Sequence, residues 1–132
     1  MKKLIFLILI GFIAGCYTEA KFNSSIKEVG LETDKDLYHS GEVMHISAYI
    51  DSPAAFKDVK VRFYGIYSGR YRLDTTKIVD FVSGKNTVSI DYNAPRCYGC
   101  AGIKPGTYQI NVDVIYGNQT LGTSSVDIEI RQ

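Results

Sequence analysis

The chain has 132 residues, enough for one domain, and a formal net charge of +1 from 15 Lys+Arg and 14 Asp+Glu. Without residues 1–15, which hold Lys2 and Lys3, the balance is 13 basic against 14 acidic residues, and no remaining stretch is polybasic. This balance excludes binding to nucleic acid through many phosphate contacts, and it excludes charge-driven attachment to an anionic lipid surface. Ten Tyr, many Val and Ile, and only three Pro favour β structure.

The N-terminal segment has the pattern of an export signal. Lys2 and Lys3 form a positive start, and Leu4 to Ile13 form an apolar core that is too short to span a bilayer comfortably. Ile13-Ala14-Gly15-Cys16 resembles the lipobox of bacterial lipoproteins, which are lipidated on Cys and cleaved before it. Ile13 departs mildly from the Leu preferred there. An ordinary signal peptide, or an N-terminal membrane anchor with an incidental Cys, is the alternative.

The lipobox resemblance implies an anchor and a location. Cys16 would become the lipidated N-terminus, and several acyl chains together, palmitate among them, make a stable membrane anchor. The domain would then sit on the cell membrane, facing away from the cytoplasm. Tyr17, rather than Asp, follows the Cys, and the resemblance implies that this permits sorting to an outer membrane where the cell has one.

The chain therefore divides into a signal peptide over 1–15, a lipidated N-terminus with a short polar tether over 16–25, and a domain over 26–132. Asn23 and Asn118 begin tripeptides that match the N-glycosylation pattern, which most prokaryotes leave unmodified.

Alternating apolar residues predict seven or eight short strands in the domain, about ten residues apart and with no helix. The longest alternation, at Tyr108, Ile110, Val112, Val114 and Tyr116, predicts the central strand. A hairpin-type loop is expected at 83–86. The fold class is all-β, an antiparallel sandwich with Greek-key connections. Its expected strands are 26–33, 44–50, 59–64, 71–73, 76–82, 88–92, 107–116 and 121–130.

Two sequence runs resemble prokaryotic extracellular immunoglobulin-like domains. One is Thr33-Asp34-Lys35 followed by Tyr38-His39-Ser40-Gly41-Glu42, and the other is Ile103-Lys104-Pro105-Gly106-Thr107-Tyr108. The resemblance covers roughly 28–131 and implies a structural corner at Tyr108, whose hydroxyl would bond upstream backbone. The antibody-type Cys…Trp…Cys pattern is absent. The fold carries adhesion, spacing, chaperone and docking roles alike, so the resemblance does not indicate a function.

Cys97 and Cys100 form the one candidate reactive motif. In an exported chain, a structural disulfide that stiffens the loop is the favoured interpretation. A redox site would need a depressed thiol pKa, and the nearby Gly and Pro make the required helix unfavourable. A metal site would need two more ligands, for which His39 and His45 are the only histidines. Free thiols are the remaining alternative.

The other motifs of common enzymes are missing, so no catalytic residue, metal or cofactor is expected. A candidate contact surface is formed by Tyr64, Tyr67, Arg70, Tyr71 and Arg72, because exposed Tyr and Arg anchor interfaces and Tyr also stacks on sugar rings. The alternation before them predicts that Tyr64 and Ile66 point outward. Cross-strand pairing that shields a sheet edge is the alternative for this run.

The sequence thus favours a non-enzymatic surface lipoprotein whose domain is an interaction or structural module, with an envelope protein or a glycan as partner. The alternative is a membrane-tethered thiol–disulfide or metal-handling protein that acts through Cys97 and Cys100. An accessory subunit of an envelope complex is a third option.

Overall fold

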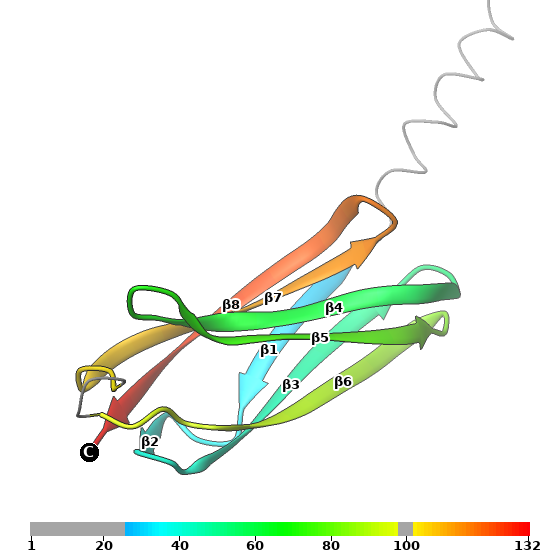
Figure 1. Ribbon diagram of the computed structural model, residues 1–132. Coiled ribbons are helices and arrows are strands. Elements are labelled where there is room, and N and C mark those ends of the chain that lie inside the picture. Colours follow the sequence, from blue (N-terminus) through cyan, green and yellow to red (C-terminus); the bar gives the residue numbers. More distant parts are fainter. Residues whose placement is uncertain (1–25, 98–101) are drawn as a thin grey trace, which may run out of the picture.

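The computed structural model describes residues 26–97 and 102–132, and these residues form an all-β domain of two packed sheets (Figure 1). The all-β prediction is confirmed. Eight strands make up the sheets: β1 (Glu28–Thr33), β2 (Leu37–His39), β3 (Val43–Ser52), β4 (Phe56–Tyr67), β5 (Tyr71–Phe81), β6 (Gly84–Asn93), β7 (Gly106–Tyr116) and β8 (Gln119–Arg131).

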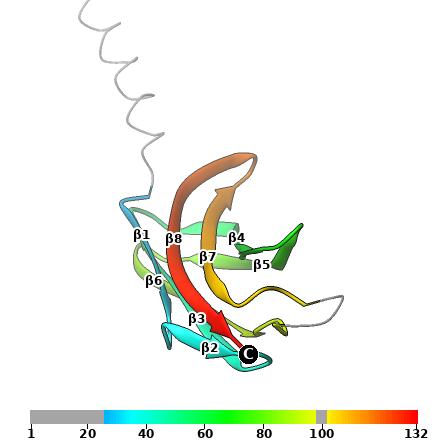
Figure 2. The same cartoon turned by 90° about the vertical axis from the view of Figure 1, so that its left-hand side faces the viewer.

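One sheet has three strands in the order β1-β3-β6, and the other has five in the order β2-β8-β7-β4-β5. β7 lies in the middle of the larger sheet, which confirms it as a central strand. The larger sheet curls strongly, and Figure 2 shows the bend of β7 and β8. The chain changes sheet at every connection except the β4–β5 and β7–β8 turns.

The core lies between the two sheets and follows the period-two pattern of the sequence. Every second residue is buried along β3, over 59–65 in β4, over 110–114 in β7 and at 128 and 130 in β8, because successive strand side chains point to opposite faces. The fully buried side chains include Met44, Ile46, Val59, Val61, Phe63, Ile110, Val112, Val114 and Ile130.

The strand pairing differs from the prediction in three places. β2 pairs with β8 in parallel, so the sheets are not wholly antiparallel. The segments 71–73 and 76–82 form one strand, β5, because its backbone pairs with β4 from Tyr71 to Phe81 even where side-chain alternation is lost. The expected hairpin-type loop at 83–86 instead carries the chain from one sheet to the other. The Asn86 side chain holds this connection, since it accepts a hydrogen bond from the Val82 amide and donates one to the Val82 carbonyl, each at 2.9 Å.

The outward orientation predicted for Ile66 is wrong. Ile66 is completely buried, and its backbone adopts a positive φ of 51° that turns the side chain into the core. The preceding Gly65 explains this bend, since its φ is +154° and a Cβ there would lie 2.2 Å from the Gln109 carbonyl oxygen. The close approach of β4 and β7 at Gly65 therefore changes which face the next residue occupies.

The strands place the connections at two opposite ends of the domain (Figure 1). At the first, which we call the entry end, the described chain begins: the Lys27 amide donates to the Asp51 carbonyl and Ile26 lies near Gly122, close to the β7–β8 turn. At the other, the distal end, lie the β4–β5 turn and the C-terminus. Side chains at the distal end therefore lie far from the point where the chain enters the domain.

Candidate interaction surface

Three tyrosines from the β4–β5 hairpin stack into one exposed cluster at the distal end. The rings of Tyr64 and Tyr71 lie 5.2 Å apart at 82°, and the rings of Tyr67 and Tyr71 lie 5.2 Å apart at 71°. Such edge-to-face contacts fix the rings relative to one another. Tyr67 is 61% exposed and Tyr71 is 44% exposed, so the assembled cluster remains open to solvent. We call Tyr64, Tyr67 and Tyr71 the tyrosine cluster.

An ion pair supports the cluster from one side. The Arg62 guanidinium lies 4.3 Å from the centre of the Tyr64 ring and donates to both carboxylate oxygens of Asp74, at 2.9 and 3.0 Å. This two-pronged hydrogen bond raises the pKa of Arg62 and lowers that of Asp74, so both groups remain charged. The Tyr64 hydroxyl donates to Asp113 at 3.3 Å, and burial, followed by the Asp113 charge, raises the Tyr64 pKa.

The predicted arginines are placed differently from the tyrosines. Arg70 is exposed in the β4–β5 turn. Arg72 is half-buried, and its Nε and one terminal nitrogen donate to the Ser68 carbonyl at 3.3 and 3.2 Å, which braces the turn. Arg72 is therefore a structural support here. Arg62 and Asp74 were not identified from the sequence, because only the register of β4 and β5 brings them together.

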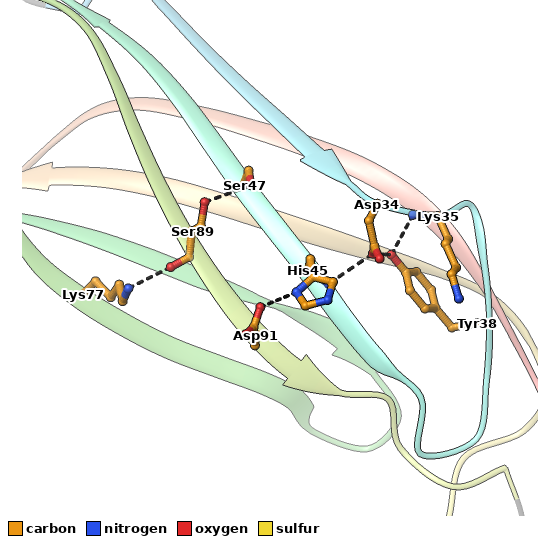
Figure 3. Close-up of polar contacts among 8 residues, drawn as sticks. All are labelled: Asp34, Lys35, Tyr38, His45, Ser47, Lys77, Ser89 and Asp91. Carbon is orange, nitrogen blue, oxygen red and sulfur yellow. Dashed lines mark hydrogen bonds and ion pairs between the residues drawn. The ribbon is translucent and has the colours of Figure 1, made fainter.

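A second polar surface covers the outer face of the three-stranded sheet (Figure 3). His45 on β3 and Asp91 on β6 are direct cross-strand partners, with Nδ1 and Oδ1 2.5 Å apart. The hydroxyls of Ser47 and Ser89 lie 2.9 Å apart in the next row. Lys77, from β5 of the other sheet, donates to the Ser89 carbonyl at 2.8 Å and so joins the two sheets along this side.

The turn between β1 and β2 is fixed by a buried tyrosine. Tyr38 is fully buried, its hydroxyl donates to an Asp34 carboxylate oxygen, and it accepts the Lys35 amide at 2.9 Å (Figure 3). The same Asp34 oxygen accepts the His45 amide at 3.1 Å. Burial, followed by the Asp34 hydrogen bond, raises the pKa of Tyr38 to about 12, while the Tyr38 hydroxyl lowers the Asp34 pKa. The turn is thus locked to β3.

The His45–Asp91 pair predicts a pH dependence of stability. The hydrogen bond to Asp91, followed by its charge, raises the His45 pKa, with Asp34 adding to this shift and Lys35 opposing it. A raised folded-state pKa means that the stabilisation is complete below the unfolded value of about 6.5 and is lost as the pH rises through the folded value. Asp91→Asn should therefore lower the unfolding midpoint more at about pH 5.5 than at about pH 9.

The expected difference is small because both side chains are exposed. Ser89→Ala, which changes the adjacent uncharged row, is the control and should show the same shift at both pH values. Equal shifts for Asp91→Asn at the two pH values would contradict the assignment.

The other predicted site residues lie apart from these surfaces. Cys97 is buried, its amide donates to the Ser40 hydroxyl at 2.9 Å, and it has no disulfide within the described part of the chain. Cys100 lies outside the described residues, so the pairing of the two cysteines stays a prediction. The Tyr108 hydroxyl donates to the Lys104 carbonyl, four residues upstream, as a structural corner requires.

Cys16 and Asn23 also lie outside the described residues, and Asn118 is exposed in the β7–β8 turn. Across 26–97 and 102–132, no three His, Cys, Asp or Glu side chains are grouped so that they could hold a metal ion. The same residues include no helix with the length and hydrophobicity needed to cross a bilayer.

No protein-family model matches this sequence, and no curated protein matches it. Solved structures do match in fold. The chain is similar to the solution structure of the CARDB domain of a Pyrococcus furiosus protein, with a TM-score of 0.55 and 13% identity over 78% of this chain and 92% of that one. It is also similar to the crystal structure of that domain in complex with di-metal ions, with a TM-score of 0.54 and 14% identity over 82% and 96% of the two chains.

Part of a larger enzyme has a similar fold as well. The chain matches a cycloisomaltooligosaccharide glucanotransferase from Paenibacillus sp. with a TM-score of 0.60 and 18% identity, covering 82% of this chain but 14% of the enzyme. These likenesses define the class of protein: an all-β domain with a CARDB-like fold. At such low identities they establish the fold alone.

Proposed function

We propose that this chain is a non-enzymatic surface lipoprotein whose Ig-like, Greek-key domain is an interaction module held near the membrane. In this proposal the signal peptide ends at residue 15, Cys16 carries the lipid, and residues 16–25 form the tether. The domain faces away from the cytoplasm and binds an envelope protein or a glycan. The CARDB-like fold supports this proposal, since it is compatible with a binding role without catalysis.

The observation that carries the proposal is the tyrosine cluster. Exposed Tyr rings that are held rigid lose little entropy on binding, and residues of this type dominate the energy of protein interfaces. The cluster also lies at the distal end, while the chain enters at the opposite end (Figure 1). A tether of ten residues reaches at most roughly 35 Å, so a lipid at Cys16 would keep the entry end near the bilayer and leave the cluster accessible.

The thiol alternative gains no support from the cysteine that is described. A working thiolate needs solvent access and a cationic or helical environment, whereas Cys97 is only 6% exposed in a loop between strands. The burial of Cys97 therefore favours the interaction module over the thiol alternative.

The test is capture of partners from solubilised membranes with wild-type protein and a Tyr67→Ala/Tyr71→Ala double variant. Because hot-spot residues each contribute more than about 1 kcal/mol, the variant should lose about ten-fold or more of the specific partner signal. Tyr116→Ala is the matched control, since Tyr116 is 42% exposed but belongs to the entry end. Each variant loses at least one ring contact worth about 0.5–1.5 kcal/mol, since Tyr116 also stacks on Phe56, so capture is carried out well below the unfolding midpoints of all variants. Capture of the same partners by the double variant at wild-type levels would overturn the role of the cluster.

A further inference from the structure

A single aromatic side chain, Tyr49, lies on the largely polar outer face of the three-stranded sheet. Tyr49 on β3 is 45% exposed and lies between two hollows. The first has a volume of about 400 Å³ and includes Glu28, Gly30, Asp51, Lys85 and Thr87 in its lining. The second has a volume of about 280 Å³ and is lined by Glu32, Thr33, Asp34, His45 and Ser47, with Tyr49 shared between the two. The first volume is within the range of small-molecule sites, roughly 300–1,000 Å³.

The strand register explains why the Tyr49 ring is open. Its cross-strand partners are Gly30 on β1 and Thr87 on β6, so its neighbours on both sides are small. Gly30 has no positive φ, and an added Cβ would meet only ordinary contacts with Tyr49, at 3.8 and 3.9 Å. The backbone therefore does not require glycine at this position. Glycine within a strand weakens the strand and often marks a place where a ligand approaches closely.

The charges around Tyr49 restrict the chemistry of the ligand. The adjacent row across the sheet is Glu28, Asp51 and Lys85, from β1, β3 and β6. The two hollows contain the carboxylates of Glu28, Glu32, Asp34 and Asp51 against the single ammonium group of Lys85, so they disfavour an anionic ligand, while carboxylate oxygens readily accept hydrogen bonds from hydroxyl groups. Asp34 in the second hollow already accepts the Tyr38 hydroxyl and the His45 amide, so its charge is partly engaged. A neutral ligand with many hydroxyl groups fits this combination.

We propose that the outer face of β1 and β3 binds a neutral oligosaccharide, with one sugar ring stacked on Tyr49. A pyranose has an apolar C–H face that matches an aromatic ring, and its hydroxyls can donate to carboxylates and pair with Thr87 or Lys85. Because Tyr49 borders both hollows, the adjoining sugar units extend along the β1–β3 pair. This inference rests on the proposed function and names a glycan as the partner class, at a surface separate from the tyrosine cluster.

A cross-strand aromatic can also stabilise a strand simply by covering a glycine. The two roles differ in their consequences. If Tyr49 only covers Gly30, its loss lowers stability and no saccharide is bound. If Tyr49 is a stacking platform, its loss removes binding, and filling the space beside it at Gly30 removes binding as well.

The experiment titrates the full-length chain in detergent with neutral tetrasaccharides of glucose, mannose, galactose and N-acetylglucosamine, by calorimetry up to about 10 mM. At least one should bind. Tyr49→Ala should weaken that binding by about ten-fold or more, whereas Tyr49→Phe, which keeps the ring, should remain within about three-fold of wild type. Gly30→Val should also weaken binding, with an unfolding midpoint at or above the wild-type value; Gly30→Ala is used if the valine variant is unstable.

Absence of binding by all four tetrasaccharides overturns the inference, as does wild-type affinity in Tyr49→Ala. Tighter binding of an oligoglucuronate or of a deacetylated chitosan tetramer would overturn the assignment to neutral glycans. The Tyr67→Ala/Tyr71→Ala variant should bind the tetrasaccharide normally. The experiment therefore distinguishes failure of saccharide binding at Tyr49 from failure of partner binding at the tyrosine cluster.

Discussion

Gly65→Ala is expected to destabilise the domain by about 3–5 kcal/mol, a large part of the total stability of a domain of this size. An alanine Cβ would lie 2.2 Å from the Gln109 carbonyl oxygen and 2.8 Å from the Ile110 Cα, and both are backbone atoms that cannot move aside. The φ of +154° adds strain for any side chain. Relief of the clash would separate β4 from β7 at the centre of the larger sheet. Chemical denaturation gives the free energy of unfolding.

Gly41→Ala is the matched control. Its φ is +76°, but no atom lies within 4 Å of the added Cβ, so only the backbone strain of about 1–2 kcal/mol remains. Equal losses of unfolding free energy in the two variants would contradict the close contact between β4 and β7 at Gly65. Burial of Ile66 depends on the same contact, so Gly65→Ala should also expose Ile66.

The strands whose faces were predicted correctly are those with sustained alternation between two paired neighbours. β3 and β7 are examples, because a strand inside a sheet buries one face where it lies over the opposite sheet, and apolar residues at every second position meet that requirement. β5 is an edge strand with little buried surface, and accordingly its sequence has no clear period. Its continuity comes from backbone pairing with β4, which leaves no side-chain signal.

The features that could not be predicted depend on contacts between distant segments. β2 has three residues and no period, and the burial of Tyr38 follows from its parallel pairing with β8, about ninety residues later in the chain. The direction of Ile66 depends on one backbone angle beside Gly65. Nothing in the local sequence distinguishes either residue from a surface one.

The candidate sites were predictable only in part, for the same reason. The aromatic composition of the β4–β5 hairpin identified Tyr64, Tyr67 and Tyr71, which are close in sequence. Recognition of the Arg62–Asp74 pair requires the register of the hairpin. The opposition of Tyr49 to Gly30 requires the register of β1 and β3, which lie on either side of an intervening strand and turn. Composition thus indicates which kinds of residue a site contains, and strand pairing decides which of those residues are in contact.

Cys16→Ser is expected to remove the protein from the membrane and to leave either an unprocessed precursor or a released chain. Serine has no thiol to accept the lipid, and anchoring depends on several acyl chains acting together, each buried CH₂ contributing about 0.8 kcal/mol. A single chain would already bind only marginally, so a chain with none should leave the detergent-rich phase almost completely. Detergent phase partitioning and intact mass measure the two consequences separately.

Ala20→Ser is the control, since it introduces the same side chain four residues after Cys16, within the proposed tether, and should partition like wild type. If Cys16→Ser partitions and migrates like wild type, the lipobox interpretation of residues 13–16 is wrong. In a released and processed variant, the tyrosine cluster and Tyr49 should remain intact, because both are built within β1, β3, β4 and β5. Tetrasaccharide binding in solution should then equal that of the anchored protein, since the lipid fixes only where the domain is held.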